Sequence, residues 1–84
     1  MLANAICKPD ELMDTTLKAA RRIADNAPIA VRQAKQAIHK GLQMGLLDGI
    51  AFEIEAYNRT VSTADRREGV KAFNEKRKAT FRGE

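Results

Sequence analysis

The sequence predicts an all-α fold of about four short amphipathic helices. Apolar residues recur at spacings of three and four along most of the chain, which is the period of one helix face. No segment alternates apolar and polar residues as a half-buried strand would. Two prolines and a Ser-Thr pair stand where helices would begin. With 84 residues, the chain is long enough for one small domain, 1–84.

Residues 1–8 are expected to form a connection that leads into the first helix. The expected helices are 10–25, 28–44, 47–61 and 64–78. Pro9 and Pro28 introduce the first two helices, because proline fits the first turn of a helix. Asn26 is available as a cap for the second helix, and Gly41 and Gly45 bracket its end.

The third helix has the most regular apolar stripe in the chain. This stripe consists of Leu47, Ile50, Ile54, Tyr57 and Val61. Leu46 and Phe52 lie outside it, so part of this apolar surface is expected to contact a partner. Ser62 or Thr63 is expected to cap the fourth helix, with Asp65 in its first turn.

Composition indicates a cytoplasmic protein with a basic C-terminal end. The single cysteine, Cys7, cannot form an intramolecular disulfide, which fits a reducing compartment. The apolar stretches are too short for a membrane span, and the first residues do not read as a signal peptide. The 15 basic and 11 acidic residues give a net charge of +4, which favours anionic partners.

Spacing alone reveals no catalytic or metal-binding constellation. His39 has no cysteine, serine or carboxylate at a motif distance, and is read as a surface or capping residue at a helix end. Glu53 and Glu55 are two residues apart, so they point to different sides of a helix and cannot act on one substrate atom. Glu55 is expected to pair with Arg59 instead.

The C-terminal stretch EGVKAFNEKRKATF is the strongest functional candidate. Phe73 and Lys76 are three residues apart, so on one helix the aromatic ring could stack on a purine while the lysine reaches a phosphate. A solvated basic face is an equally good interpretation of these charges. Gly69 costs about 1 kcal/mol relative to alanine in a helix, which favours close packing against another backbone.

Three features in fixed order resemble the C-terminal region of the enoyl-CoA hydratase/isomerase (crotonase) family. They are Ala27-Pro28 opening a helix that carries Lys35, the segment from Leu47 to Glu53, and STADRREGVKAFNEKRKATF. The resemblance covers nearly the whole chain. It implies the helical trimerisation region of a crotonase-fold protein, without the N-terminal ββα spiral core that holds the family's catalytic residues.

The same resemblance implies a function as the C-terminal assembly region of an enoyl-CoA hydratase. The parent enzyme would hydrate 2-enoyl-CoA in fatty-acid or related acyl-CoA metabolism. This chain would have no catalytic residues and would be inactive alone. Phe73 and Lys76 match the family's coenzyme A contacts, while Arg77 and Lys78 match less closely.

The partners implied are acyl-CoA and further copies of the chain, as a trimer or hexamer in the parent. No cofactor or metal is expected, since coenzyme A arrives as the thioester substrate, and no membrane contact is expected. The alternative is a small basic helical module for nucleic-acid binding or oligomerisation. Nucleic-acid binding is disfavoured because the basic residues are dispersed and only four aromatic residues occur.

Overall fold

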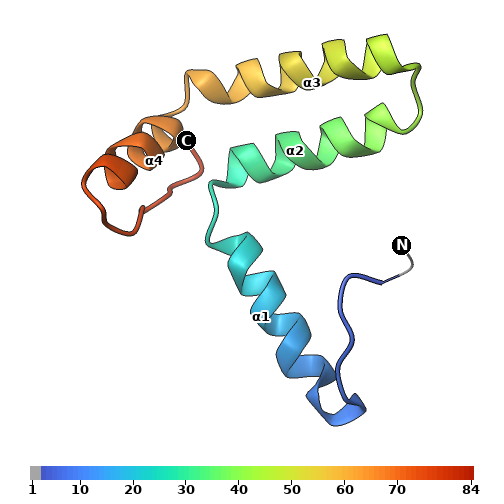
Figure 1. The fold of residues 1–84 in the computed structure, drawn as a ribbon. Coiled ribbons are helices and arrows are strands. Elements are labelled where there is room, and N and C mark those ends of the chain that lie inside the picture. Colours follow the sequence, from blue (N-terminus) through green and yellow to red (C-terminus); the bar gives the residue numbers. More distant parts are fainter. Residues whose placement is uncertain (1–2) are drawn as a thin grey trace.

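The computed structural model describes residues 3–84 and contains four α-helices with no β-strand in that range, which confirms the all-α prediction (Figure 1). A 3-10 turn, η1, covers Pro9–Glu11. The helices are α1 Leu12–Ala24, α2 Pro28–Gly41, α3 Leu46–Val61 and α4 Ala64–Asn74. Within the expected connection 1–8, residues 3–8 are non-helical, whereas residues 1–2 lie outside the described residues.

The first helix begins two residues later than expected. Lys8 has an extended backbone (φ −69°, ψ 151°), as residues before proline prefer. The Glu11 N–H then donates to the Lys8 carbonyl at 2.9 Å, which closes a 3-10 turn before α1 begins. Asn26 does not cap α2 as expected, because its side-chain amide donates to the Arg22 carbonyl at 2.7 Å and so caps the end of α1.

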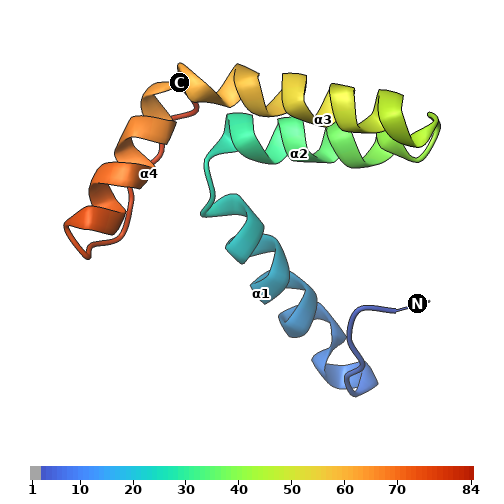
Figure 2. The ribbon, with the colours of Figure 1, turned by 45° about the horizontal axis from the view of Figure 1, so that its top comes forward.

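Helices α2 and α3 form an antiparallel hairpin and lie side by side in both views (Figures 1 and 2). Helix α2 ends at Gly41, not at 44, because residues 42–45 turn the chain back. A side-chain carbon added at Gly49 would lie 3.6 Å from the Gly41 backbone, so these glycines let the two helices approach. Arg59 adds a hydrogen bond to Gln33 across the pair at 3.3 Å.

The chain has almost no core of its own. Among the described residues, Ala56 and Ala72 are the buried apolar residues. The radius of gyration is 15.9 Å, whereas a compact domain of this length would have about 12 Å. Helices α1 and α4 extend away from the hairpin (Figures 1 and 2). Most large apolar side chains of the four helices therefore remain exposed.

Every helix exposes large apolar side chains. The more exposed of them include Leu12, Met13, Ile23, Ile38, Leu42, Leu46, Leu47, Ile54, Tyr57, Val70 and Phe73. Large exposed apolar patches are uncommon on monomeric soluble proteins and often coincide with interaction sites. Within residues 3–84, no helix has the length and hydrophobicity that a bilayer crossing requires.

Candidate functional site

Helix α4 begins with a side-chain cap at Thr63, one of the two residues expected there. The Thr63 hydroxyl accepts a hydrogen bond from the Arg66 N–H at 3.1 Å and donates to the Thr60 carbonyl at 2.7 Å. One N–H of the first turn is thereby satisfied, and the helix is fixed to the end of α3.

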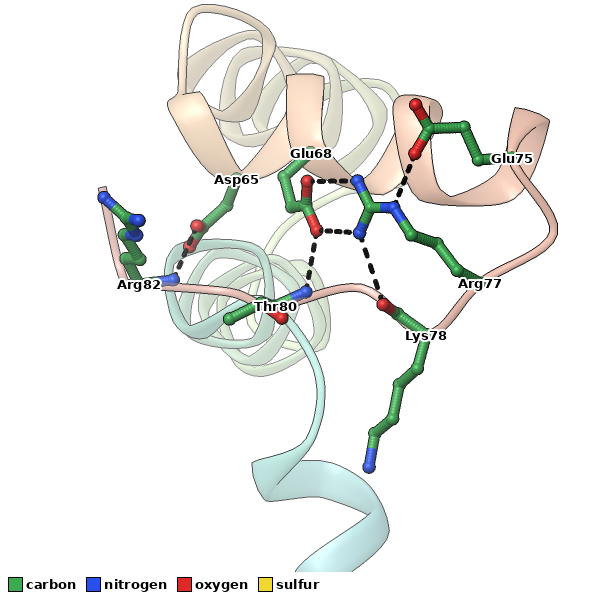
Figure 3. A network of polar contacts seen from close by, with 7 residues as sticks. All are labelled: Asp65, Glu68, Glu75, Arg77, Lys78, Thr80 and Arg82. Atoms are coloured by element: carbon green, nitrogen blue, oxygen red, sulfur yellow. Dashed lines mark hydrogen bonds and ion pairs between the residues drawn. The ribbon is translucent and has the colours of Figure 1, made fainter.

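Residues 75–84, which we term the C-terminal strap, fold back along α4 and are held by Asp65 and Glu68 (Figure 3). Asp65 is 2 % exposed, and its carboxylate accepts hydrogen bonds from the N–H groups of Arg82 at 2.8 Å and Gly83 at 2.7 Å. Its own N–H donates to the Glu84 carbonyl at 2.9 Å. The far end of the strap is thus attached to the first turn of α4.

Glu68, one turn further along α4, holds the middle of the strap. It accepts two hydrogen bonds from the Arg77 guanidinium, at 2.7 and 2.9 Å, and one from the Thr80 N–H at 2.8 Å (Figure 3). Arg77 also donates through Nε to Glu75 at 2.6 Å. Parallel hydrogen bonds between a guanidinium and a carboxylate are among the strongest in proteins and fix orientation as well as distance.

The pKa of Glu68 falls to about 2, mainly because of the hydrogen bonds from Arg77 and then because of the Thr80 N–H. The pKa of Arg77 is raised, first by Glu68 and then by Glu75. The positive charge of Arg77 is therefore paired with Glu68 of α4 and with Glu75 of the strap.

Gly69 faces an aromatic ring of the same chain, not another backbone as the sequence suggested. A side-chain carbon added there would lie 3.5 Å from Cε1 and 3.7 Å from Cζ of Phe81. Phe81 belongs to the strap, so the glycine leaves room for the strap to lie close to α4. These distances are ordinary van der Waals contacts.

Helix α4 ends at Asn74, so the expected helix 64–78 is four residues too long. Lys76 has a left-handed backbone (φ 56°). The Lys76 N–H donates to the Phe73 carbonyl at 3.2 Å, and the Arg77 N–H donates to the Ala72 carbonyl at 3.0 Å. This pair of bonds is the Schellman motif, which terminates helices and usually has glycine at the left-handed position.

The predicted pair Phe73 and Lys76 therefore does not share a regular helix face. Phe73 lies in the last turn of α4, and the residue is 83 % exposed. Lys76 is exposed on the turn that follows. Phe73 thus precedes the helix end at Asn74, and Lys76 follows it.

The remaining candidates lie apart from α4. His39 is exposed in the last turn of α2, where the sequence placed it. Glu55 pairs with Arg59 at 3.1 Å, as expected. Glu53 lines an open groove of about 540 Å³ between α2 and α3. Within residues 3–84, no group of three His, Cys, Asp or Glu side chains is arranged to hold a metal ion.

A second hollow, of about 400 Å³, lies on α4. It is lined by Arg66, Arg67, Val70, Lys71, Asn74 and Glu75. Its three basic side chains extend the positive surface of α4 beyond the strap.

Sequence reasoning missed the strap and its two anchors. The sequence places Asp65 in the first turn of the fourth helix but indicates no partner for it, and it indicates no role for Glu68. Their spacing of three residues was the available signal, because it places both carboxylates on one side of a helix. Their partners are mainly backbone N–H groups, which no side-chain pattern identifies.

The fold is that found in solved enoyl-CoA hydratase structures. The crystal structure of an enoyl-CoA hydratase from Bacillus anthracis aligns with 93 % of this chain at a TM-score of 0.90 and 42 % identity, and the match covers 30 % of that protein. The short-chain-enoyl-CoA hydratase of Clostridium acetobutylicum is 44 % identical over 77 residues, which are 92 % of this chain and 30 % of that protein.

A Bacillus subtilis protein named for the enoyl-CoA hydratase/isomerase family, YngF, is 49 % identical over 82 residues, covering 98 % of this chain. The family model for enoyl-CoA hydratase/isomerase matches residues 2–84. The chain belongs to the enoyl-CoA hydratase/isomerase family. It spans between about a fifth and a third of the length of the curated relatives that it matches, from 20 % of the human methylglutaconyl-CoA hydratase to 32 % of YngF.

Proposed function

We propose that this chain is the C-terminal assembly region of an enoyl-CoA hydratase. In this proposal the full-length protein adds water across the double bond of a 2-enoyl-CoA, in fatty-acid or related acyl-CoA metabolism in the cytoplasm. The catalytic residues belong to the ββα core, which precedes the helices. The 84 residues contribute subunit contacts and one edge of the coenzyme A site.

One observation supports the assembly role: the chain forms four ordered helices, yet these helices bury almost no apolar core of their own. Only two apolar residues among those described are buried, while apolar side chains are exposed on each of α1 to α4. Hydrophobic surface of this extent favours burial against other protein. We propose that these surfaces are covered by the ββα core of the full-length protein and by neighbouring copies, in a trimer or hexamer.

Phe73 and Lys76 are the proposed coenzyme A contacts. The exposed ring of Phe73 is available to stack on adenine, and Lys76 supplies a positive charge for a phosphate. Arg77 is a poorer candidate than the sequence suggested, since Glu68 and Glu75 bind its guanidinium. Lys78 lies 4.0 Å from Asp25, an exposed pair that holds its side chain weakly.

Hydration assays with crotonyl-CoA test whether the catalytic activity belongs to the core and not to these helices. The full-length protein is expected to hydrate the thioester, and the 84-residue chain alone is expected not to. Measurable turnover by the isolated chain would contradict the proposal. A full-length protein that remains active and keeps its oligomeric state after deletion of the helices would contradict the assembly role.

A further inference from the structure

The three consecutive basic residues 76–78 have different surroundings. Arg77 is held by two carboxylates, and Lys78 lies near Asp25. For Lys76, no ion pair occurs among the described residues. Lys76 therefore carries the least engaged of these three charges, and it occupies the most unusual backbone position.

The left-handed conformation of Lys76 needs support from its surroundings. Residues with a side chain seldom adopt it, and glycine is the usual choice at this position of a Schellman motif. Two backbone hydrogen bonds hold the turn on its helical side. On its other side, the residue that directly follows Lys76 is Arg77, whose side chain is attached to Glu68 by two hydrogen bonds.

Glu68 also fixes the chain beyond the turn. Its carboxylate accepts the Thr80 N–H at 2.8 Å, while Arg77 donates to the Lys78 carbonyl at 3.3 Å (Figure 3). The backbone on the C-terminal side of Lys76 is thereby attached to the middle of α4. Without the Glu68 carboxylate, this side of the turn would lose three hydrogen bonds.

We propose that Glu68 is a positioning residue for coenzyme A: by holding Arg77, it keeps Lys76 on the turn beside Phe73, from which its ammonium group reaches a ligand phosphate. This inference rests on the proposed coenzyme A contact. Glu68 itself does not touch the ligand. Arg77 serves as the link between the carboxylate and the turn, and its own charge is neutralised there.

The test compares two substrates of the full-length protein. Crotonyl-CoA carries the adenosine and phosphate groups, and the crotonyl thioester of pantetheine lacks them. The Lys76→Ala variant is expected to lower kcat/KM for crotonyl-CoA roughly tenfold, the value of one charge-assisted hydrogen bond. It is expected to leave kcat/KM for the pantetheine thioester unchanged. Equal values for Lys76→Ala and the parent with both substrates would overturn the proposed coenzyme A contact itself.

The Glu68→Gln variant then tests the positioning role. It is expected to lower kcat/KM for crotonyl-CoA by about threefold to tenfold, again with no change for the pantetheine thioester. The double variant Glu68→Gln with Lys76→Ala is expected to be no worse than Lys76→Ala alone, because both changes remove one contact. Arg77→Lys, which keeps the charge but loses the paired hydrogen bonds, is expected to act in the same direction.

The matched control is Asp65→Asn, which loosens the strap at Arg82 and Gly83 without touching Arg77. Its ratio of kcat/KM values for the two substrates is expected to equal that of the parent protein. If Lys76→Ala selectively impairs crotonyl-CoA but Glu68→Gln and Arg77→Lys do not, the positioning role is wrong and the coenzyme A contact stands. Equal losses with both substrates, or additive losses in the double variant, would likewise overturn the positioning role.

Discussion

Glu68 and Arg77 form a two-point ion pair, with Nη1 to Oε2 at 2.7 Å and Nη2 to Oε1 at 2.9 Å. They are nine positions apart in the sequence, and the helix end lies between them. Their contact brings the basic C-terminal residues back onto α4. The sequence predicted one continuous helix over 64–78, whereas the structure has helix α4, a turn at Lys76 and the C-terminal strap.

The first prediction concerns pH. The folded chain holds the pKa of Glu68 near 2, below its ordinary value of 4.5, so its carboxylate stabilises the strap above about pH 4.5. This contribution is expected to decline as the pH falls from about 4.5 toward 2. The free energy of unfolding of the full-length protein, measured by urea denaturation, should exceed that of its Glu68→Gln variant at neutral pH, and the difference should shrink over that window. A difference that stays constant down to pH 2 would contradict this.

The second prediction concerns the turn at Lys76. Glycine adopts the left-handed conformation without steric cost, so Lys76→Gly is expected to stabilise the chain by about 1 kcal/mol while removing the proposed ligand contact. Asn74→Gly, at the last helical residue, is the control and is expected to give no gain. Urea denaturation of both variants measures the effect. Loss of stability in Lys76→Gly would argue against the left-handed turn.

The third prediction concerns Gly69. Its added side-chain carbon would meet the Phe81 ring at 3.5 Å, so alanine fits and is expected to stabilise α4 by about 0.5–1 kcal/mol. Leucine is expected to displace Phe81 and to destabilise the strap. Thermal unfolding of Gly69→Ala and Gly69→Leu tests this pair. A strong loss with alanine would indicate a closer neighbour than Phe81, such as another subunit.

The fourth prediction concerns the isolated chain in solution. Because its helices expose apolar faces and bury little, it is expected to associate with copies of itself. Sedimentation equilibrium should give an average mass above the 9.3 kDa of one chain, rising with concentration. A stable monomer at high concentration would contradict the view that these faces need partners.

The starts of the helices were predicted well, because a capping residue or a proline lies near them. Pro28 begins α2, and Thr63 caps α4. The ends were predicted less well. Residues 75–82 contain no glycine or proline, so the usual stop signal is missing directly after Asn74, and the turn that ends the helix has a lysine in the left-handed conformation.

For the candidate site, the role of Phe73 and Lys76 stays a prediction, and the sequence did not indicate the geometry around them. Phe73 and Lys76 could be singled out by residue type and spacing, but the spacing argument assumed a continuous helix. The contacts of Glu68 with Arg77 and the Thr80 N–H depend on a chain reversal that residue patterns do not encode. Gly69 was expected to be closely packed, yet its neighbour, Phe81, is brought there by the same reversal.

The most direct test of the proposed coenzyme A edge is the affinity of the full-length protein for coenzyme A, measured by titration calorimetry. Phe73→Ala and Lys76→Ala are each expected to raise the Kd by roughly tenfold, since each removes a stacking or a charge-assisted contact. Asn74→Ala, between the two sites, is the control and should bind like the parent. Unchanged affinity in both Phe73→Ala and Lys76→Ala would contradict the proposal and leave these helices with a role in assembly alone.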